Sequence, residues 1–142
     1  MTPTELARHW FESIWNRRQI EEIFRLLEPG IEGDSEGGVI TGPEQFRDQI
    51  FIPFTSAFPD LRIEVVGTVA EGDEVVVRWR ARGTHTGDAF GLKGSQRQIE
   101  FSGMTWFRIR DGRVVAGWDR YNLGALASCL ATGAQTQTVR SI

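Results

Sequence analysis

The chain has 142 residues, a formal net charge of −3 and a hydrophobic content of 40%, the profile of an ordinary globular domain. No row of Lys or Arg gives it a basic face, so we expect no nucleic-acid partner. The single cysteine, Cys129, excludes an internal disulfide, and two isolated histidines without a paired ligand motif argue against a metal site.

The first thirty residues predict two amphipathic helices, because apolar residues recur there at three- and four-residue spacing. The first helix begins at Thr2, which can cap it, while Glu5 completes a capping box. We expect this helix to end near Asn16. The second covers residues 20–27 and is closed by Pro29-Gly30.

The next segment predicts a loop and a third helix. Residues 30–42 are rich in glycine and acidic side chains, which indicates a loop with one short strand possible near Val39. A helix then starts after Thr41 and extends to Phe58. Pro53 lies inside it and should kink or break it.

The hydrophobic period changes from about 3.6 to about 2 after Leu61, which predicts strands. The expected strands cover residues 62–70, 75–85, 99–109 and 114–121. A turn at residues 71–74 and a tight turn at Asp111-Gly112 make hairpins, so the sheet should be antiparallel. A short helix over residues 123–130 follows, and the tail at 134–142 is expected to be frayed.

Helices followed by a β-meander predict an α+β fold with a strongly curved antiparallel sheet. No linker or repeat divides the chain, so we expect a single domain over residues 1–142. No apolar run is long enough to span a bilayer, and no charged region followed by an apolar stretch opens the chain. We therefore expect a cytoplasmic protein without a membrane partner.

Several local strings support a family resemblance by their order and spacing. They are Gly42-Pro43-Glu44-Gln45-Phe46, Ala57-Phe58-Pro59-Asp60-Leu61, Val77-Arg78-Trp79, Gly83-Thr84-His85-Thr86-Gly87, Phe101-Ser102-Gly103, and Asp111-Gly112-Arg113-Val114-Val115 leading to Trp118-Asp119. Over residues 5–130 the chain resembles the SnoaL-like polyketide cyclases of the nuclear transport factor 2-like superfamily. The resemblance implies a cone-shaped half-barrel with the N-terminal helices in its concave face, enclosing a pocket. It also implies a homodimer and chemistry that needs no cofactor.

The chain departs from the family pattern on its last long strand. Many members carry Glu-His where this chain has Ala116-Gly117, and many carry an acid near Asn122. A His–Asp pair on that strand is therefore absent here.

Asp119 is the first candidate catalytic residue. Side chains two apart on a strand share a face, so Val115, Gly117, Asp119 and Tyr121 should point the same way. If that face lines the pocket, burial raises the pKa of the Asp119 carboxyl toward the range useful for proton transfer. The resemblance implies that this Asp acts as acid and base in an intramolecular aldol closure, with Tyr121 as a ligand-binding neighbour.

His85 is the second candidate catalytic residue, because it ends its strand on the apolar face beside a glycine-rich loop. A histidine there can polarise a carbonyl or shuttle a proton. The alternative is a histidine that hydrogen-bonds a loop carbonyl and shapes the turn. For Asp119 the alternative is a strand-end carboxylate, solvated or paired with Arg120 or Arg108.

Three further residues are candidate ligand contacts. Asp34 lies in a glycine-rich stretch near the place where relatives have a polar pocket residue, although such a stretch can equally be only a turn. Trp15 and Trp79 can line the pocket or fill the core.

The outward face of the sheet is a candidate contact surface. The arginines of residues 78–82 should pair across strands with Glu64 or Glu100. Met104 and Trp106 add a large apolar patch that is not expected to be left to water. The sequence therefore predicts a homodimer formed through the strand that carries residues 78–82 and the strand over residues 98–110.

Three functions fit these observations. The first is a cofactor-independent enzyme that cyclises or isomerises a small hydrophobic carbonyl compound by acid–base proton transfer. The second is a non-catalytic module that binds such a molecule. The third is an assembly domain that uses the outer face of the sheet. The places of Asp119 and His85 relative to the largest cavity discriminate among them.

Overall fold

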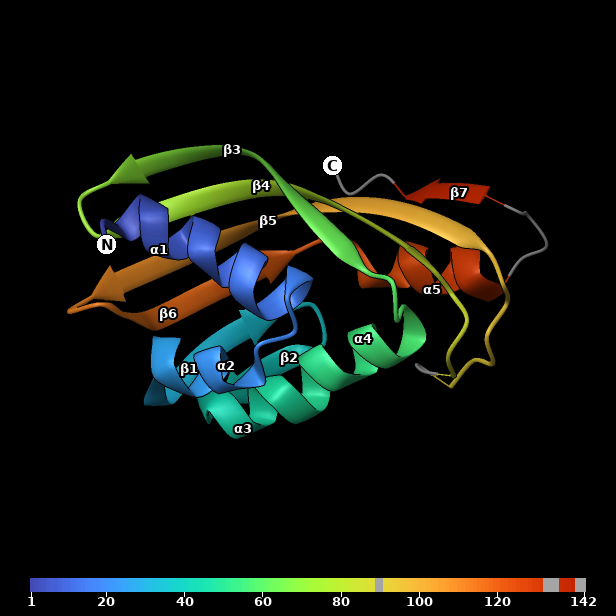
Figure 1. Cartoon of the computed structure of the whole chain (residues 1–142), viewed down its shortest axis with the longest axis horizontal. Helices are drawn as coiled ribbons and strands as arrows, with labels where there is room; N and C mark the ends of the chain where they lie inside the picture. Colours follow the sequence, from blue (N-terminus) through green and yellow to red (C-terminus); the bar gives the residue numbers. More distant parts are fainter. Residues whose placement is uncertain (89–90, 132–135, 140–142) are drawn as a thin grey trace.

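In the computed structural model, which describes residues 1–88, 91–131 and 136–139, helices pack on the concave side of one curved sheet (Figure 1). The helices are α1 (Pro3–Trp10), α2 (Ile20–Leu26), α3 (Gly42–Phe46), α4 (Ile52–Ala57) and α5 (Leu123–Ala131). The strands are β1 (Leu27–Ser35), β2 (Gly38–Thr41), β3 (Arg62–Glu71), β4 (Glu74–Thr84), β5 (Gln98–Arg110), β6 (Arg113–Arg120) and β7 (Thr136–Val139). Within the described residues, no helix is both long and apolar enough to cross a membrane.

The strands are ordered β2-β1-β6-β5-β4-β3, and β7 pairs with β5. Strands β3 to β6 form the predicted antiparallel meander, which confirms the α+β fold with a curved sheet. The sheet as a whole is mixed, because β1 runs parallel to β6 and β7 runs parallel to β5. The expectation of a wholly antiparallel sheet was therefore wrong at those two pairings.

Strand β1 and strand β7 lie where no such strands were expected. Residues 27–35 were predicted as a helix end and a loop, since Pro29, Gly30 and Gly33 disfavour a strand. They are ordered by pairing with β6, and Ile31 is buried. Thr136–Val139 is a strand rather than part of a frayed tail; the rest of that predicted tail lies outside the described residues.

The first helix begins and ends as predicted. The Thr2 hydroxyl accepts a hydrogen bond from the Glu5 N–H at 3.1 Å, which caps α1. A π-helical turn, Phe11–Asn16, extends α1. The Asn16 side chain then accepts from the Ile63 N–H at 2.7 Å and donates to the Ile63 carbonyl at 2.8 Å. These two bonds attach the end of the helix to β3.

Pro53 does not interrupt the third helical segment as strongly as expected. A π-helical turn, Arg47–Phe51, joins α3 to α4, and Pro53 lies in the first turn of α4 directly after it. A missing N–H is tolerated best in a first turn, so the helical run continues from Gly42 to Ala57.

The inward side chains of β5 and β6 form the floor of the concave face. The β5 residues Ile99, Phe101, Gly103, Thr105, Phe107 and Ile109 are buried, and the residues between them are more exposed. A register shift lets Ile109 pair with Val114 and Arg108 with Ala116, so Val115 is the extra residue of a bulge. Inward on β6 are therefore Val114, Gly117 and Asp119, whereas Val115 was expected on that face.

Gly103 gives a test of how tightly this floor is packed. A β-carbon at Gly103 would lie 2.6 Å from the Arg120 carbonyl oxygen and 2.6 Å from Cζ2 of Trp79. We expect Gly103→Ala to lower the free energy of unfolding by about 1–3 kcal/mol, measured by urea denaturation. Gly67→Ala in β3 is the control, since no heavy atom lies within 4 Å of a β-carbon there. Equal stabilities of the two variants would contradict this packing.

Candidate functional site

Two adjoining cavities lie between the helices and the concave face of the sheet. The first, with about 500 Å³ of empty space including its mouth, is lined by β1, β2, α3, β5 and β6. The second, with about 440 Å³ of empty space including its mouth, is lined by α1 and the turn after it, α4, and strands β3 to β6. Both are bordered by Trp10, Phe46, Ile50, Thr105 and Asp119. Asp119 therefore lies where the two cavities meet.

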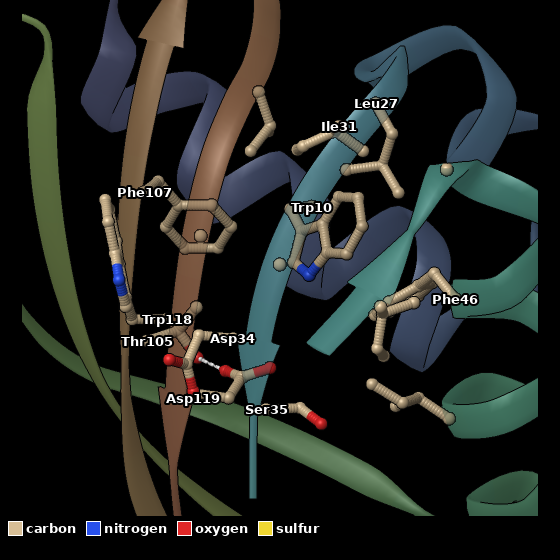
Figure 2. Close-up of a pocket in the computed structure, with 16 residues that line it drawn as sticks. Trp10, Leu27, Ile31, Asp34, Ser35, Phe46, Thr105, Phe107, Trp118 and Asp119 are labelled. Atoms are coloured by element: carbon tan, nitrogen blue, oxygen red, sulfur yellow. Dashed lines mark hydrogen bonds between the residues drawn. The ribbon is translucent and has the colours of Figure 1, made fainter. Parts of the chain in front are cut away.

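The walls are apolar except at one end. Figure 2 shows Asp34, Ser35, Thr105 and Asp119 together at that end of the first cavity, while rings such as Trp10 surround the rest. A small molecule in this space would meet aromatic and aliphatic surface along most of its length and polar groups at one end.

A short chain of hydrogen bonds links Trp79 on β4 and Thr105 on β5 to Asp119 on β6. The Trp79 indole N–H donates to the Thr105 hydroxyl oxygen at 2.9 Å. The Thr105 hydroxyl in turn donates to Oδ1 of Asp119, a bond drawn in Figure 2. Thr105 and Asp119 are direct partners across β5 and β6, so the strand register holds them together.

Burial is the main influence on the Asp119 carboxyl. Although the residue keeps some solvent access, side chains enclose its carboxyl, and this desolvation raises the pKa to about 6. The Thr105 hydrogen bond and the charge of Arg120 lower the pKa, and the charge of Glu36 raises it. A carboxyl with a pKa near 6 is mostly ionised at neutral pH and is a stronger base than an exposed aspartate.

The two arginines considered as partners of Asp119 are paired elsewhere. Arg120 forms an ion pair with Asp34 at 3.0 Å, and Arg108 forms one with Glu74 at 3.0 Å. In the described part of the chain, no ion pair joins the Asp119 carboxylate to a basic side chain. Of the predicted alternative, a strand-end carboxylate that is solvated or paired with Arg120 or Arg108, the pairing is not found in the described residues.

Tyr121 lines the second cavity together with Asp119. Its ring packs edge-on against Phe54, with centroids 5.6 Å apart. Burial, and then the charges of Asp119 and Glu36, raise the pKa of the Tyr121 hydroxyl. The phenol therefore keeps its proton at neutral pH and can donate a hydrogen bond.

The structure brings five of the six candidate residues to these cavities. Trp15 and Trp79 line the second cavity with Asp119 and Tyr121, and Asp34 lines the first. Since Trp15 and Trp79 are also buried, each contributes to the core and to the cavity wall.

His85 lies apart from both cavities. It is fully buried against the Phe58 ring, and its Nδ1 accepts from the Ser95 N–H at 3.2 Å. Its backbone N–H donates to the Arg97 carbonyl at 2.9 Å. Burial, followed by the charge of Arg97, lowers the pKa of the imidazole, which is therefore neutral at pH 7. The side chain thus contacts the loop after β4 through Ser95, whereas its buried Nε2 has no hydrogen-bond partner in the described residues. His85 is not among the residues that line the two cavities with Asp119.

Thr105 and Glu36 are parts of the site that the sequence analysis missed. Thr105 could have been found, because it is a polar residue in an otherwise apolar inward series on a strand. Glu36 accepts hydrogen bonds from the backbone N–H groups of Tyr121 and Asn122, at 2.8 and 3.0 Å. Asn122 accepts from the Ala125 N–H and caps α5 instead of contributing to the cavities.

Gly117 lines the first cavity. The nearest atom to a β-carbon there would be the Trp106 carbonyl oxygen, at 3.7 Å, so an added β-carbon would fit in ordinary van der Waals contact. No group of three or more His, Cys, Asp or Glu side chains that could hold a metal ion occurs among the residues the structure describes.

Comparisons with known proteins agree with this fold. The family described as SnoaL-like polyketide cyclase matches residues 5–129. A candidate SnoaL-like polyketide cyclase from Jannaschia sp. CCS1 has a TM-score of 0.84 at 22% identity, and 93% of each chain is covered. No match was found among curated proteins.

Two Streptomyces structures are also similar. IdmH, a candidate polyketide cyclase from Streptomyces antibioticus, has a TM-score of 0.80 at 24% identity, covering 93% of this chain and all of its own. AclR, a candidate hydroxylase from Streptomyces galilaeus, has a TM-score of 0.79 at 27% identity, covering 91% of this chain and 80% of its own.

The raised pKa of Asp119 has a measurable effect on stability. In the unfolded chain this carboxyl loses its proton near pH 4, whereas in the folded chain it keeps the proton until about pH 6. Its contribution to wild-type stability therefore falls as the pH rises from about 4 to 6. We expect Asp119→Asn to raise the free energy of unfolding at pH 7 by up to about 3 kcal/mol, with the gain shrinking toward pH 4.

Urea denaturation between pH 4 and pH 8 measures this difference. Asp73→Asn, which removes a carboxylate from the turn between β3 and β4, controls for the loss of one negative charge. If Asp119→Asn were instead less stable than the wild type at pH 7, the inference that desolvation raises the pKa of this carboxyl would be wrong.

Proposed function

Because the chain belongs to the SnoaL-like polyketide cyclase family, we propose that it is a cofactor-independent enzyme acting on a small hydrophobic carbonyl compound. One observation carries the proposal: the Asp119 carboxyl lies at the junction of two apolar cavities with a pKa of about 6 and no arginine ion pair in the described chain. Such a group can take a proton from a ligand and return it near neutral pH.

The proposed chemistry is proton transfer leading to ring closure. The Asp119 carboxylate removes a proton from the carbon next to a carbonyl group, and the resulting enolate carbon bonds to a second carbonyl carbon of the same molecule. The proton then passes from Asp119 to the new alkoxide oxygen, so the carboxylate is regenerated without an oxidant or reductant. Tyr121 keeps its proton and can stabilise the negative oxygen by a hydrogen bond.

The aromatic lining of the cavities favours a flat hydrophobic substrate. Trp10, Phe46 and Ile50 border both spaces, and the first also has Asp34 and Ser35 at its polar end. Rings of this kind bind flat apolar molecules by stacked or edge-on contacts. The likeness to candidate cyclases and a candidate hydroxylase supports small-molecule chemistry on this fold.

A non-catalytic binding module is the second possible function, and Gly117 favours it. The histidine that the family resemblance implies on β6 is absent, because residue 117 is a glycine, so Asp119 has no second acid–base group beside it on that strand. The same cavities would then hold a hydrophobic ligand without converting it.

Exchange of the carbon-bound proton tests the enzymatic proposal without the natural substrate. We expect the protein to speed deuterium exchange at the acidic carbon of a hydrophobic aryl 1,3-diketone in D₂O, followed by ¹H NMR, with a rate that rises around pH 6. Asp119→Asn should slow this exchange by about 10²–10⁴-fold, because it removes the base while retaining the shape. Asp73→Asn serves again as the charge control.

The binding module would be favoured if the bound diketone exchanged its proton no faster than in buffer and Asp119→Asn changed neither the exchange rate nor the affinity for the diketone. Calorimetry with the same compound supplies the affinity.

We also propose that the outer face of the sheet binds a second copy of the chain. Met104 and Trp106 are 41% and 46% exposed there, and the Trp106 ring lies 6.2 Å from that of Trp118. Arg80 pairs across the strands with Glu64 and Glu100, as predicted, at 3.7 and 3.4 Å. An apolar patch bordered by such pairs suits an interface between copies.

Trp106→Glu should convert the dimer to a monomer, because it introduces a charge into the apolar patch. Light scattering after gel filtration at micromolar concentration measures the mass. Ile52→Glu is the matched control, since Ile52 is 43% exposed but lies on α4, on the other side of the sheet. A monomeric wild type would refute the proposal.

A further inference from the structure

We propose that Thr105 is a positioning residue. Its hydroxyl accepts a hydrogen bond from the Trp79 N–H and donates one to Oδ1 of Asp119, an arrangement we call the relay. Oδ1 is then occupied as an acceptor, and Oδ2 is the oxygen that exchanges protons with the ligand. The part concerning the ligand rests on the proposed function. The part concerning the protein rests on the hydrogen bonds alone.

The direction of the two hydrogen bonds is fixed by the groups involved. An indole N–H can donate but cannot accept. Because the Trp79 nitrogen lies 2.9 Å from the Thr105 hydroxyl oxygen, that oxygen accepts at this contact. A hydroxyl has a single proton to donate, and the Thr105 proton is directed to Oδ1 of Asp119.

In the ionised carboxylate, Oδ1 can only accept, so the Thr105 proton occupies Oδ1 and leaves Oδ2 open. A proton that Asp119 takes from the ligand therefore goes to Oδ2. While it stays there, the Thr105 hydrogen bond to Oδ1 is kept. The same oxygen, Oδ2, takes a proton from the ligand carbon and gives it to the ligand oxygen, and the carboxyl need not rotate between the two steps.

Packing holds the donor end of this chain in place. Trp79 and Thr105 are 5% and 6% exposed, so water does not compete for their hydrogen bond. The Trp79 ring packs edge-on against Phe101 at 5.9 Å and lies over Gly103, where any side chain would displace it. This packing restricts the indole and keeps its N–H directed at the Thr105 oxygen.

The Asp119 pKa, measured by ¹³C NMR of the carboxyl without any ligand, tests the relay. Thr105→Val removes the hydroxyl and keeps the shape, so we expect the pKa to rise above about 6 by about one unit, since a hydrogen bond that favours the charged form is lost. Thr105→Ser should return it toward the wild-type value. Trp79→Phe, which keeps an aromatic ring but removes the N–H, should raise it by less than Thr105→Val.

A merely structural Thr105 would give a different result. Thr105→Val would then lower the melting temperature while the Asp119 pKa stayed at its wild-type value, and this outcome overturns the proposal. If Thr105→Val does not fold, the pair Thr105→Ser and Trp79→Phe decides it: a pKa that is the same in Trp79→Phe as in the wild type also overturns the relay.

The diketone exchange assay separates the two proposals. With both correct, Thr105→Val lowers the exchange rate by about tenfold well below pH 6, because a pKa one unit higher leaves about a tenth of the carboxylate there. The pH midpoint moves upward with the pKa, and Thr105→Ser restores both. A pKa that responds as expected in a protein that never accelerates exchange supports the hydrogen-bond chain and refutes the catalytic role of Oδ2. Exchange by the wild type with an unchanged midpoint in Thr105→Val refutes the relay alone.

Discussion

Aromatic packing against the concave face of the sheet determines which groups are exposed to water. Trp10 packs against Phe46 from the helices and Phe107 from the sheet, with ring centroids 5.0 and 6.1 Å apart. Phe11 contacts Phe107 at 6.0 Å and Trp79 at 6.4 Å, which continues the layer toward the second cavity. Each such pair contributes about 0.5–1.5 kcal/mol beyond the area it buries. The space left inside this layer is consequently apolar.

The Asp119 carboxyl lies at the edge of this aromatic layer, and its basicity is a balance of opposing effects. Desolvation favours the neutral form, whereas the Thr105 hydroxyl and the Arg120 charge favour the carboxylate. With desolvation alone, the pKa would be higher and less of the group would be ionised at neutral pH. With a direct arginine ion pair, the pKa would be lower and the carboxylate would be a weaker base. The balance gives a pKa of about 6, which serves both steps of a proton transfer.

Residue periodicity could predict which face a side chain occupies but not where along the strand a cavity lies. The alternation correctly placed Asp119 and Tyr121 on the inward face, and it also pointed His85 to the buried side. His85 nevertheless lies beyond the cavities, because its distance from Asp119 depends on strand lengths and pairings that alternation does not specify. Strand β1 was not predictable, since Pro29 and its glycines give no alternating pattern, and its order comes from pairing with the distant β6.

That unpredicted strand completes the site. Its parallel register with β6 places Asp34 opposite Trp118, where its carboxylate can pair with Arg120. Arg120 is thereby held away from direct pairing with Asp119, while its charge still lowers the pKa of that carboxyl. The same register sets Gly33 opposite Gly117, so neither strand has a side chain there to fill the first cavity. A ligand in the first cavity would therefore meet the carboxyls of Asp119 and Asp34 but no histidine, because residue 117 is a glycine.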